Sequence, residues 1–220
     1  MSDLGKDFSD IAGGGLPFPA AGSGIDIDFV NRRYWWNGAA KTEANFTTFT
    51  LNGSTFGPNG LLPTDTIDVT LALAGLGSLV PGAMAVGFRL NSVPGTARTI
   101  VVLDDGTVTE RVAFTVSTGG TAAFVVSDNN VTQASMSTPA LALQRHGLAG
   151  SFDVNNFLGS ADGAALTADN AGTLPTLTTL RVGRAPAASA ITGSISRIVC
   201  FTATKPQGQC NYLSSVLRAY

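Results

Sequence analysis

The chain has 220 residues, of which 13% are charged, with 26 glycines and a formal net charge of −2. This length allows one sizeable hydrophobic core, and the slightly acidic balance offers no basic surface for phosphates, so nucleic acid is not expected as a partner. The mean hydropathy is +0.24. No apolar run approaches the roughly 20 residues that span a bilayer, and no membrane partner is expected.

The first 24 residues have the composition of an arm or linker. Their second half, GGGLPFPAAGSG, contains too much glycine, proline and alanine for helix or strand periodicity. The segment before it is acidic and has no basic region ahead of an apolar stretch, so it is not a secretory signal. We therefore expect a flexible N-terminal arm on a protein made in a cytoplasm. The arm either docks onto a larger assembly or is a terminus without a role.

From residue 25 onward, short apolar runs alternate with turn residues at roughly 8 to 12 residue spacing, as in a β-sandwich or barrel. Within these runs the apolar residues fall two apart, as Val112, Phe114 and Val116 do, which gives each strand one buried face. The expected strands cover residues 24–30, 45–51, 66–74, 84–90, 98–105, 108–117, 121–128, 146–154, 179–185 and 194–201.

Two turns and one helix complete the expected elements. The turn Phe56–Gly60 combines proline with Asn-Gly, and Asp-Gly follows the strand that ends near Asp104, so both are predicted hairpin turns. Low helix content is expected. The exception is residues 210–220, where an apolar face at helical spacing predicts one short helix that Asn211 would cap.

An aromatic and polar cluster after the first strand is the candidate ligand site. Sugars present apolar C–H faces to aromatic rings and hydroxyls to amide and guanidinium groups. The sequence RRYWWN supplies all of these and contains both tryptophans of the chain. The alternatives are packing in the core and packing against a neighbouring subunit. The candidate glycan-binding residues are Arg32, Tyr34, Trp35, Trp36 and Asn37.

No catalytic pattern is found. A retaining glycosidase needs two carboxylates about 5 to 5.5 Å apart, yet the chain has only Glu43 and Glu110 as glutamates, and they lie in separate segments. Asp26 and Asp28 share a strand face, but the apolar residues between them place both on the solvent side of an edge-like strand. His146 is the only histidine and no serine sits in a nucleophile elbow. We therefore expect the protein not to be an enzyme.

Calcium and a disulfide are weaker possibilities. Calcium needs several oxygen ligands, which the turn residues Asp104, Asp105, Asp128 and Asp153 would offer, although Asx residues at turns need no metal. No other cofactor is expected. Cys200 lies in an alternating strand and reads as a small buried hydrophobe, whereas Cys210 follows a polar segment and is expected to be accessible. A bond between Cys200 and Cys210 stays open as an alternative to free thiols.

Three stretches carry a resemblance to a known group. IDIDFVNRRYWWNG at 25–38 and TFTLNGSTFGPNGLL at 48–62 are similar to the opening strand and first hairpin of concanavalin A-like (laminin G-like) jelly rolls in bacteriophage virion proteins, and TLRVGRAPAASAITGSISRIVCF at 179–201 resembles their closing hairpin. The resemblance implies an all-β antiparallel jelly-roll sandwich over residues 25–203, with an arm at 1–24 and a tail at 204–220. The last twenty residues depart from the pattern of the group.

The same resemblance implies a setting. It predicts a non-catalytic component of a phage or prophage virion, such as a fibre, spike or decoration protein of head or tail, with host-surface polysaccharide as a ligand. Its partners would be other virion proteins and further copies of itself, because subunit interfaces absorb apolar surface. The rival prediction is a capsid or tail stabiliser without a ligand, and a weaker one is a glycan depolymerase.

Overall fold

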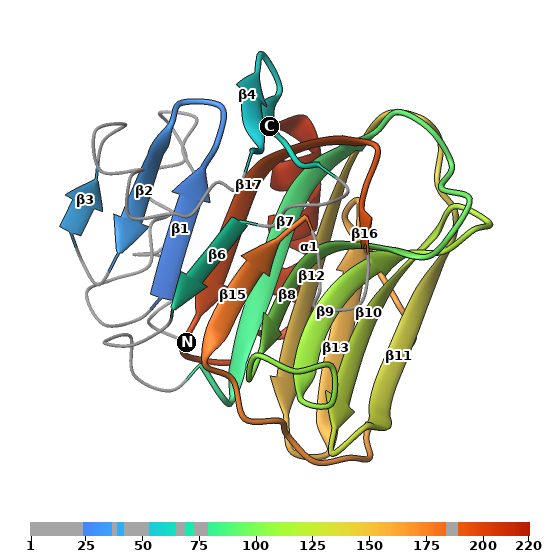
Figure 1. Ribbon diagram of the computed structural model, residues 1–220. Helices are drawn as coiled ribbons and strands as arrows, with labels where there is room; N and C mark the ends of the chain where they lie inside the picture. The colour runs from blue at the N-terminus through green and yellow to red at the C-terminus, as the bar shows by residue number, and fades with distance from the viewer. Residues whose placement is uncertain (1–23, 37–38, 42–52, 65–68, 73–78, 184–188) are drawn as a thin grey trace.

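A computed structural model describes residues 24–36, 39–41, 53–64, 69–72, 79–183 and 189–220 of the chain. Its architecture has three layers, seen in Figure 1: two β-sheets packed face to face, and one helix on the outer side of the first sheet. The large apolar side chains of both sheets meet between them in one core. The predicted all-β antiparallel sandwich with one C-terminal helix is confirmed.

The sheet that carries the helix, sheet A, is built from strands at both ends of the chain. In spatial order its path is β14 (Ala164–Ala165), β13 (Asn156–Ala161), β12 (Arg145–Asp153), β7 (Gly82–Leu90), β17 (Gly193–Phe201), β1 (Gly24–Asp28), β2 (Arg33–Trp36) and β3 (Ala39–Lys41). The short hairpin of β4 (Thr55–Gly57) and β5 (Gly60–Leu62) joins it through β17. The first and last strands of the body are therefore neighbours.

The second sheet, sheet B, faces the apolar side of sheet A. Its path is β11 (Val131–Ala140), β10 (Thr121–Asp128), β9 (Arg111–Val116), β8 (Arg98–Asp104), β15 (Thr179–Val182) and β6 (Val69–Ala72). The short β16 (Ser189–Ala190) pairs in parallel with the start of β8.

Aromatic rings fill the space between the sheets. The Phe114 and Phe124 ring centroids are 5.3 Å apart, and the Phe124 and Phe152 centroids are 6.5 Å apart. Gly150 of β12 lies under the Phe124 ring, so close that a Cβ at position 150 would come within 2.4 Å of it. A glycine opposite a large ring lets the two sheets approach closely, as dense core packing requires.

Most predicted local elements are present, and one is wrong. The turn at 57–60 joins β4 to β5, the segment after Asp104 joins β8 to β9, and the opening segment forms the β1–β2 hairpin. The predicted closing hairpin is wrong, because β15 belongs to sheet B and β17 to sheet A. The two strands therefore lie in different layers and do not pair with each other.

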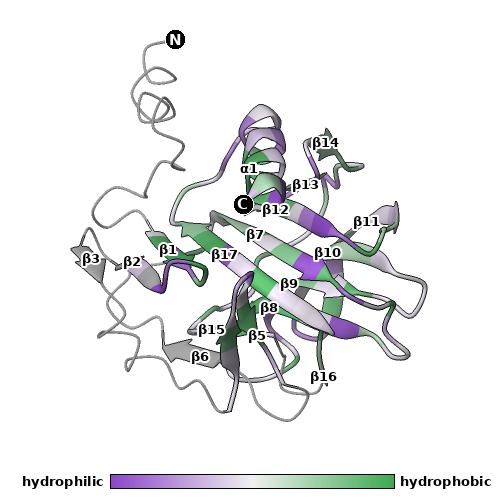
Figure 2. Ribbon diagram, turned by 90° about the horizontal axis from the view of Figure 1, so that it is seen from above, coloured by the Kyte–Doolittle hydropathy of each residue, from purple (hydrophilic) through white to green (hydrophobic). Residues whose placement is uncertain are grey.

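The C-terminal helix α1 (Gln207–Ala219) begins earlier than predicted. Its N-cap is Pro206, so Asn211 lies inside the helix and the prediction that it caps the helix is wrong. The helix packs on β12, β13 and β7, and Figure 2 shows it on the outer side of these strands. Within the described residues, no helix combines the length and apolar character needed to cross a membrane.

Two paired glycines bring α1 close to sheet A. Gly147 of β12 and Gly87 of β7 stand directly opposite each other. A Cβ at position 147 would lie 1.9 Å from the Ser214 carbonyl oxygen, and one at position 87 would lie 2.7 Å from that of Leu217. Only a residue without a side chain fits such a backbone approach.

The predicted domain boundaries stay predictions. The proposed arm at residues 1–24 lies outside the described residues except for Gly24, which starts β1. The predicted tail at 204–220 contains α1, which packs on the body of the sandwich.

Candidate functional site

A buried ion pair lies on the outer face of sheet A, beside the end of α1. The Arg197 guanidinium donates from Nε to Asp26 Oδ1 over 2.8 Å and from Nη2 to Asp26 Oδ2, and both residues are 1% exposed. An irregularity in the pairing of β17 lets Ile195 and Ile198 both face the core while Arg197 faces outward. The bidentate contact satisfies both charges where water does not reach.

The predicted solvent position of Asp26 and Asp28 is therefore wrong. The strand that carries them, β1, is not an edge, since it lies between β17 and β2. Asp28 is 2% exposed. Alternation identified their common face correctly, but the chain segment that covers this face comes from the far end of the sequence.

Tyr220 is that covering residue. Its ring centroid lies 4.9 Å from the Arg197 guanidinium carbon, and its hydroxyl donates to Asp28. Asp28 also accepts from the backbone N–H and the side-chain amide of Asn31. Burial alone would raise the pKa of Asp28, but these hydrogen bonds outweigh it and lower that pKa. Burial and the contact with Asp28 together raise the pKa of the Tyr220 hydroxyl.

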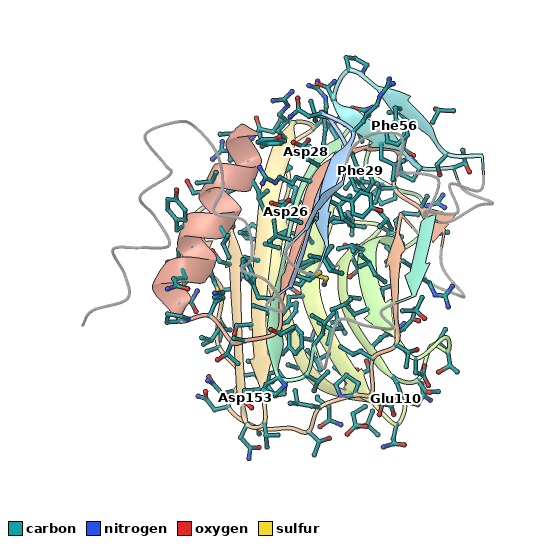
Figure 3. The ribbon with its side chains drawn as sticks, turned by 90° about the vertical axis from the view of Figure 1, so that its left-hand side faces the viewer. Asp26, Asp28, Phe29, Phe56, Glu110 and Asp153 are labelled. Carbon is teal, nitrogen blue, oxygen red and sulfur yellow. The ribbon has the colours of Figure 1, made fainter. Side chains whose placement is uncertain are left out.

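The turn between β1 and β2 presents an exposed guanidinium over an aromatic ring. Arg32 adopts the left-handed backbone conformation, with φ of 51°. Its Cζ lies 5.3 Å from the centroid of the Phe56 ring in β4, and that ring packs in turn on Phe29 at 6.4 Å. Figure 3 shows Asp28, Phe29 and Phe56 together at one end of the sandwich. A cation at this distance over a ring face is a favourable contact.

A second arginine joins this end to the β4–β5 turn. Arg145 at the start of β12 donates from Nη2 to Asn59 Oδ1 over 2.8 Å and from Nη1 to the Tyr220 carbonyl oxygen over 3.2 Å. The result is a surface with a ring, two guanidinium groups and two amides drawn from three separate segments. We call this surface the polar rim and define it by Asn31, Arg32, Phe56, Asn59 and Arg145.

The residues predicted to bind a glycan lie in different environments in the structure. Arg32 belongs to the polar rim, whereas Tyr34 is 6% exposed and packs in the core. Trp35 and Trp36 lie in β2 with their backbones registered opposite Asp26 and Ile25, and the structure does not describe their side chains. Asn37 lies outside the described residues. Sequence reasoning missed Phe56, Asn59 and Arg145. The predicted turn at 56–60 was a local signal for Phe56 and Asn59, and Arg145 had none.

The candidate calcium ligands hold turns together. Asp104 accepts from the Gly106 N–H and from Arg181 Nε, each within 2.9 Å, and burial raises the pKa of Asp104. Asp105, Asp128 and Asp153 accept from Thr107, Asn129 and the Val154 N–H respectively. No three acidic, histidine or cysteine side chains gather as a metal site in the part of the chain that the structure describes.

The two cysteines are free, so the open alternative of a disulfide is wrong. Cys200 faces the core between the sheets, whereas Cys210 belongs to α1 and packs against the other face of sheet A. The expected accessibility of Cys210 is also wrong, because it is fully buried. Burial raises the pKa of the Cys200 thiol to about 12 and that of Cys210 to about 11, so both stay protonated and unreactive.

The remaining catalytic candidates also have structural contacts. Glu110 accepts from the backbone N–H groups of Asn129 and Thr176, and Figure 3 shows it at the end of the molecule opposite Phe56. His146 is buried between Asp162 and the Ala142 carbonyl. Glu43 lies outside the described residues.

Comparisons with known proteins give a fold and no family. No protein-family model and no curated protein sequence matches the chain. Among solved structures, the CBM40 domain of the Ruminococcus gnavus IT-sialidase bound to α2,6-sialyllactose is similar at a TM-score of 0.52 and 11% identity, over 60% of this chain and 82% of that one.

A second solved structure covers more of the chain. The Trypanosoma rangeli sialidase is similar at a TM-score of 0.64 and 12% identity, over 93% of this chain, although the match spans only 34% of the sialidase. At these identities the likeness shows the β-sandwich alone. The fold is thus one that a carbohydrate-binding domain shares.

Proposed function

We propose that the protein is a non-catalytic glycan-binding sandwich and that its polar rim contacts the sugar. The observation that carries this proposal is the exposed Arg32 stacked on the half-buried Phe56, with the amides of Asn31 and Asn59 close by. Rings contact the apolar faces of sugars, and amide and guanidinium groups bind their hydroxyls. The sialyllactose-bound CBM40 domain of the same fold supports a glycan as the ligand class.

The absence of catalysis is part of the proposal. A depolymerase would need two carboxylates facing a substrate. Asp26 and Asp28 share a face, but Arg197, Tyr220 and Asn31 occupy their oxygens. A general acid or base must come within hydrogen-bond reach of the substrate, and the burial of both carboxylates supports a structural role for them.

The biological setting rests on the resemblance of residues 25–38, 48–62 and 179–201 to phage virion proteins. We propose that the protein is a fibre, spike or decoration component of a phage or prophage virion that binds host-surface polysaccharide. Other virion proteins and further copies of the chain would be its partners. A stabiliser without a ligand is the outcome that the following test separates from this role.

The test compares rim variants on an array of bacterial surface polysaccharides. Phe56→Leu keeps apolar packing on Phe29 but removes the ring, and Arg32→Gln removes the cation above it. Each is expected to weaken binding about tenfold, since an aromatic or cation–π contact contributes about 1 kcal/mol or more. Arg111→Gln in sheet B is the matched control.

Two results would overturn the proposal. If the native chain binds no polysaccharide while still assembling into particles, the stabiliser role is correct. If it binds but the two rim variants behave as Arg111→Gln does, the glycan site lies elsewhere on the sandwich. Unchanged thermal midpoints of the variants exclude misfolding as the cause of lost binding.

A further inference from the structure

Two arginines stand directly opposite each other next to the polar rim. Arg89 of β7 is registered against Arg145 of β12. In the neighbouring pair, Leu90 and Gln144, the Leu90 N–H donates to the Gln144 carbonyl oxygen over 3.0 Å. Because bonded and non-bonded pairs alternate in an antiparallel ladder, Arg89 and Arg145 form a non-bonded pair, in which side chains lie closest together.

Their side chains emerge on the outer face of sheet A, just beyond the end of α1. Gly87 and Gly147, which contact the helix, lie on the same face, each two residues away from the arginine of its strand. The contact of Arg145 with the Tyr220 carbonyl oxygen confirms the placement. Arg89 is exposed and Arg145 is partly exposed, so the pair is open to a molecule in solution.

No acidic side chain of the described residues contacts either guanidinium group. Like charges directly opposite each other on adjacent strands are destabilising. The recorded contacts of the two groups are instead with amide and main-chain oxygens. Arg89 Nε donates to Asn91 Oδ1 over 3.2 Å, and Arg145 donates to Asn59 and to the Tyr220 carbonyl.

The end of the helix explains only one of the two arginines. Arg145 donates to a carbonyl at the C-terminus of α1, where the partial negative charge of a helix favours a cation. Arg89 has no such role, and its repulsion by Arg145 remains. A guanidinium carries donors for a bidentate contact with an oxyanion, and most of these donors are unused at Arg89.

We propose that Arg89 and Arg145 form a subsite for an oxyanion group, so that the glycan bound at the polar rim is an acidic one. The subsite deepens the proposed function and rests on it for the identity of the ligand as a sugar. Asn59 links the two surfaces, because it lies in the β4–β5 turn that follows Phe56 and its side chain holds Arg145. The group recognised is a carboxylate or a phosphate ester carried on a sugar.

The test is calorimetric titration of the full chain with three sugars at constant ionic strength. Glucuronate carries a carboxylate, glucose 6-phosphate carries a phosphate ester, and glucose is neutral. We expect at least one charged sugar to bind about tenfold or more tightly than glucose, because hydrogen bonds to a charged group are stronger than neutral ones. Whichever of the two binds more tightly identifies the source of the oxyanion.

Matched variants locate the subsite. Arg89→Gln is expected to remove the preference for the charged sugar, whereas Arg111→Gln, which removes the same charge from sheet B, is expected to leave it unchanged. The inference fails if all three sugars bind alike or none binds. It also fails if both variants lower the preference equally, since that would indicate only the general field of the protein.

The inference and the proposed function fail in different ways. If neutral polysaccharides bind and Phe56→Leu abolishes that binding while the charged sugars gain nothing, the glycan site stands and the oxyanion subsite falls. If the charged sugars bind through Arg89 but Phe56→Leu and Arg32→Gln change nothing, the subsite stands and the rim does not contact the sugar.

Discussion

Single side chains join the two ends of this chain. Tyr220 covers Arg197 with its ring and binds Asp28 with its hydroxyl, and Asp28 in turn holds Asn31 beside the exposed Arg32. The last residue of the sequence thereby sets the geometry of a turn near its beginning. His146 has an analogous role, because its two ring nitrogens join Asp162 to the Ala142 carbonyl over 2.7 and 2.8 Å.

The His146 contacts predict a pH-dependent stability. Both ring nitrogens of His146 face acceptors, so the protonated ring, which has two N–H donors, fits best. Burial opposes the positive charge and would lower the pKa of His146. The hydrogen bond to Asp162 outweighs burial and raises that pKa above its ordinary 6.5. The group therefore contributes its full stability below pH 6.5 and loses it as the pH rises through the raised pKa. Asp162 and Arg218 are the charged groups that act on it.

Urea unfolding measured from pH 5 to pH 9 checks this expectation. The free energy of unfolding should fall across neutral pH in the native chain, and His146→Gln should flatten that slope. Burial alone would raise the pKa of Asp162, but the contact with His146 lowers it. The stability that Asp162 contributes is therefore lost as the pH falls through this lowered pKa, the opposite pH dependence to that of His146. A flat native profile above pH 6 would contradict the assignment.

Among the elements, α1 depends most on what lies beneath it. Alanines and glycines of β7 and β12 form the surface on which it lies, and Leu213, Leu217 and Cys210 are its buried residues. Helix packing needs a matching surface, and these small residues allow the backbone of α1 to approach the sheet itself.

Gly147→Ala is the sharpest test of this packing. The new Cβ would meet the Ser214 carbonyl at 1.9 Å and must displace the helix. We expect a loss of about 2 kcal/mol in the free energy of unfolding, as for overpacking in a core. The control is Gly95→Ala, where a Cβ meets nothing within 4 Å. Equal effects of the two substitutions in chemical denaturation would show that α1 does not press on Gly147.

We expect the whole molecule to unfold as one cooperative unit, and its two ends differ. Sheet A has apolar contacts on both faces, with sheet B on one and α1 on the other. One end carries the polar rim and the arginine pair, and Figure 3 shows Asp153 and Glu110 at the opposite end. The proposed glycan contacts therefore lie at one end of the sandwich.

Native-state hydrogen exchange can test that unity. Because α1 packs directly on β7 and β12, and leads into Tyr220, which covers Arg197, its amides should exchange with the same free energy as those of β7 and β12. Exchange of α1 at a distinctly lower free energy would make residues 204–220 a separable tail, as the sequence alone suggested.

Local pattern predicted a large part of the fold. The alternation of Val112, Phe114 and Val116, and the turn at Phe56–Gly60, were sufficient for the sandwich and its hairpins. The candidate site was found only in part, because Arg32 stands next to the predicted aromatics in sequence while Phe56, Asn59 and Arg145 come from separate segments.

Strand periodicity and turn residues are properties of neighbours in sequence, so composition and spacing determined the all-β class and its alternating faces. Which face is covered, and by what, depends on contacts between residues far apart in the chain. Asp26 and Asp28 were assigned to solvent and Cys210 to an accessible tail for this reason, and all three are buried because α1 and Tyr220 pack onto sheet A. The pairing of Arg89 with Arg145 likewise arises only when β7 and β12 come together in one sheet.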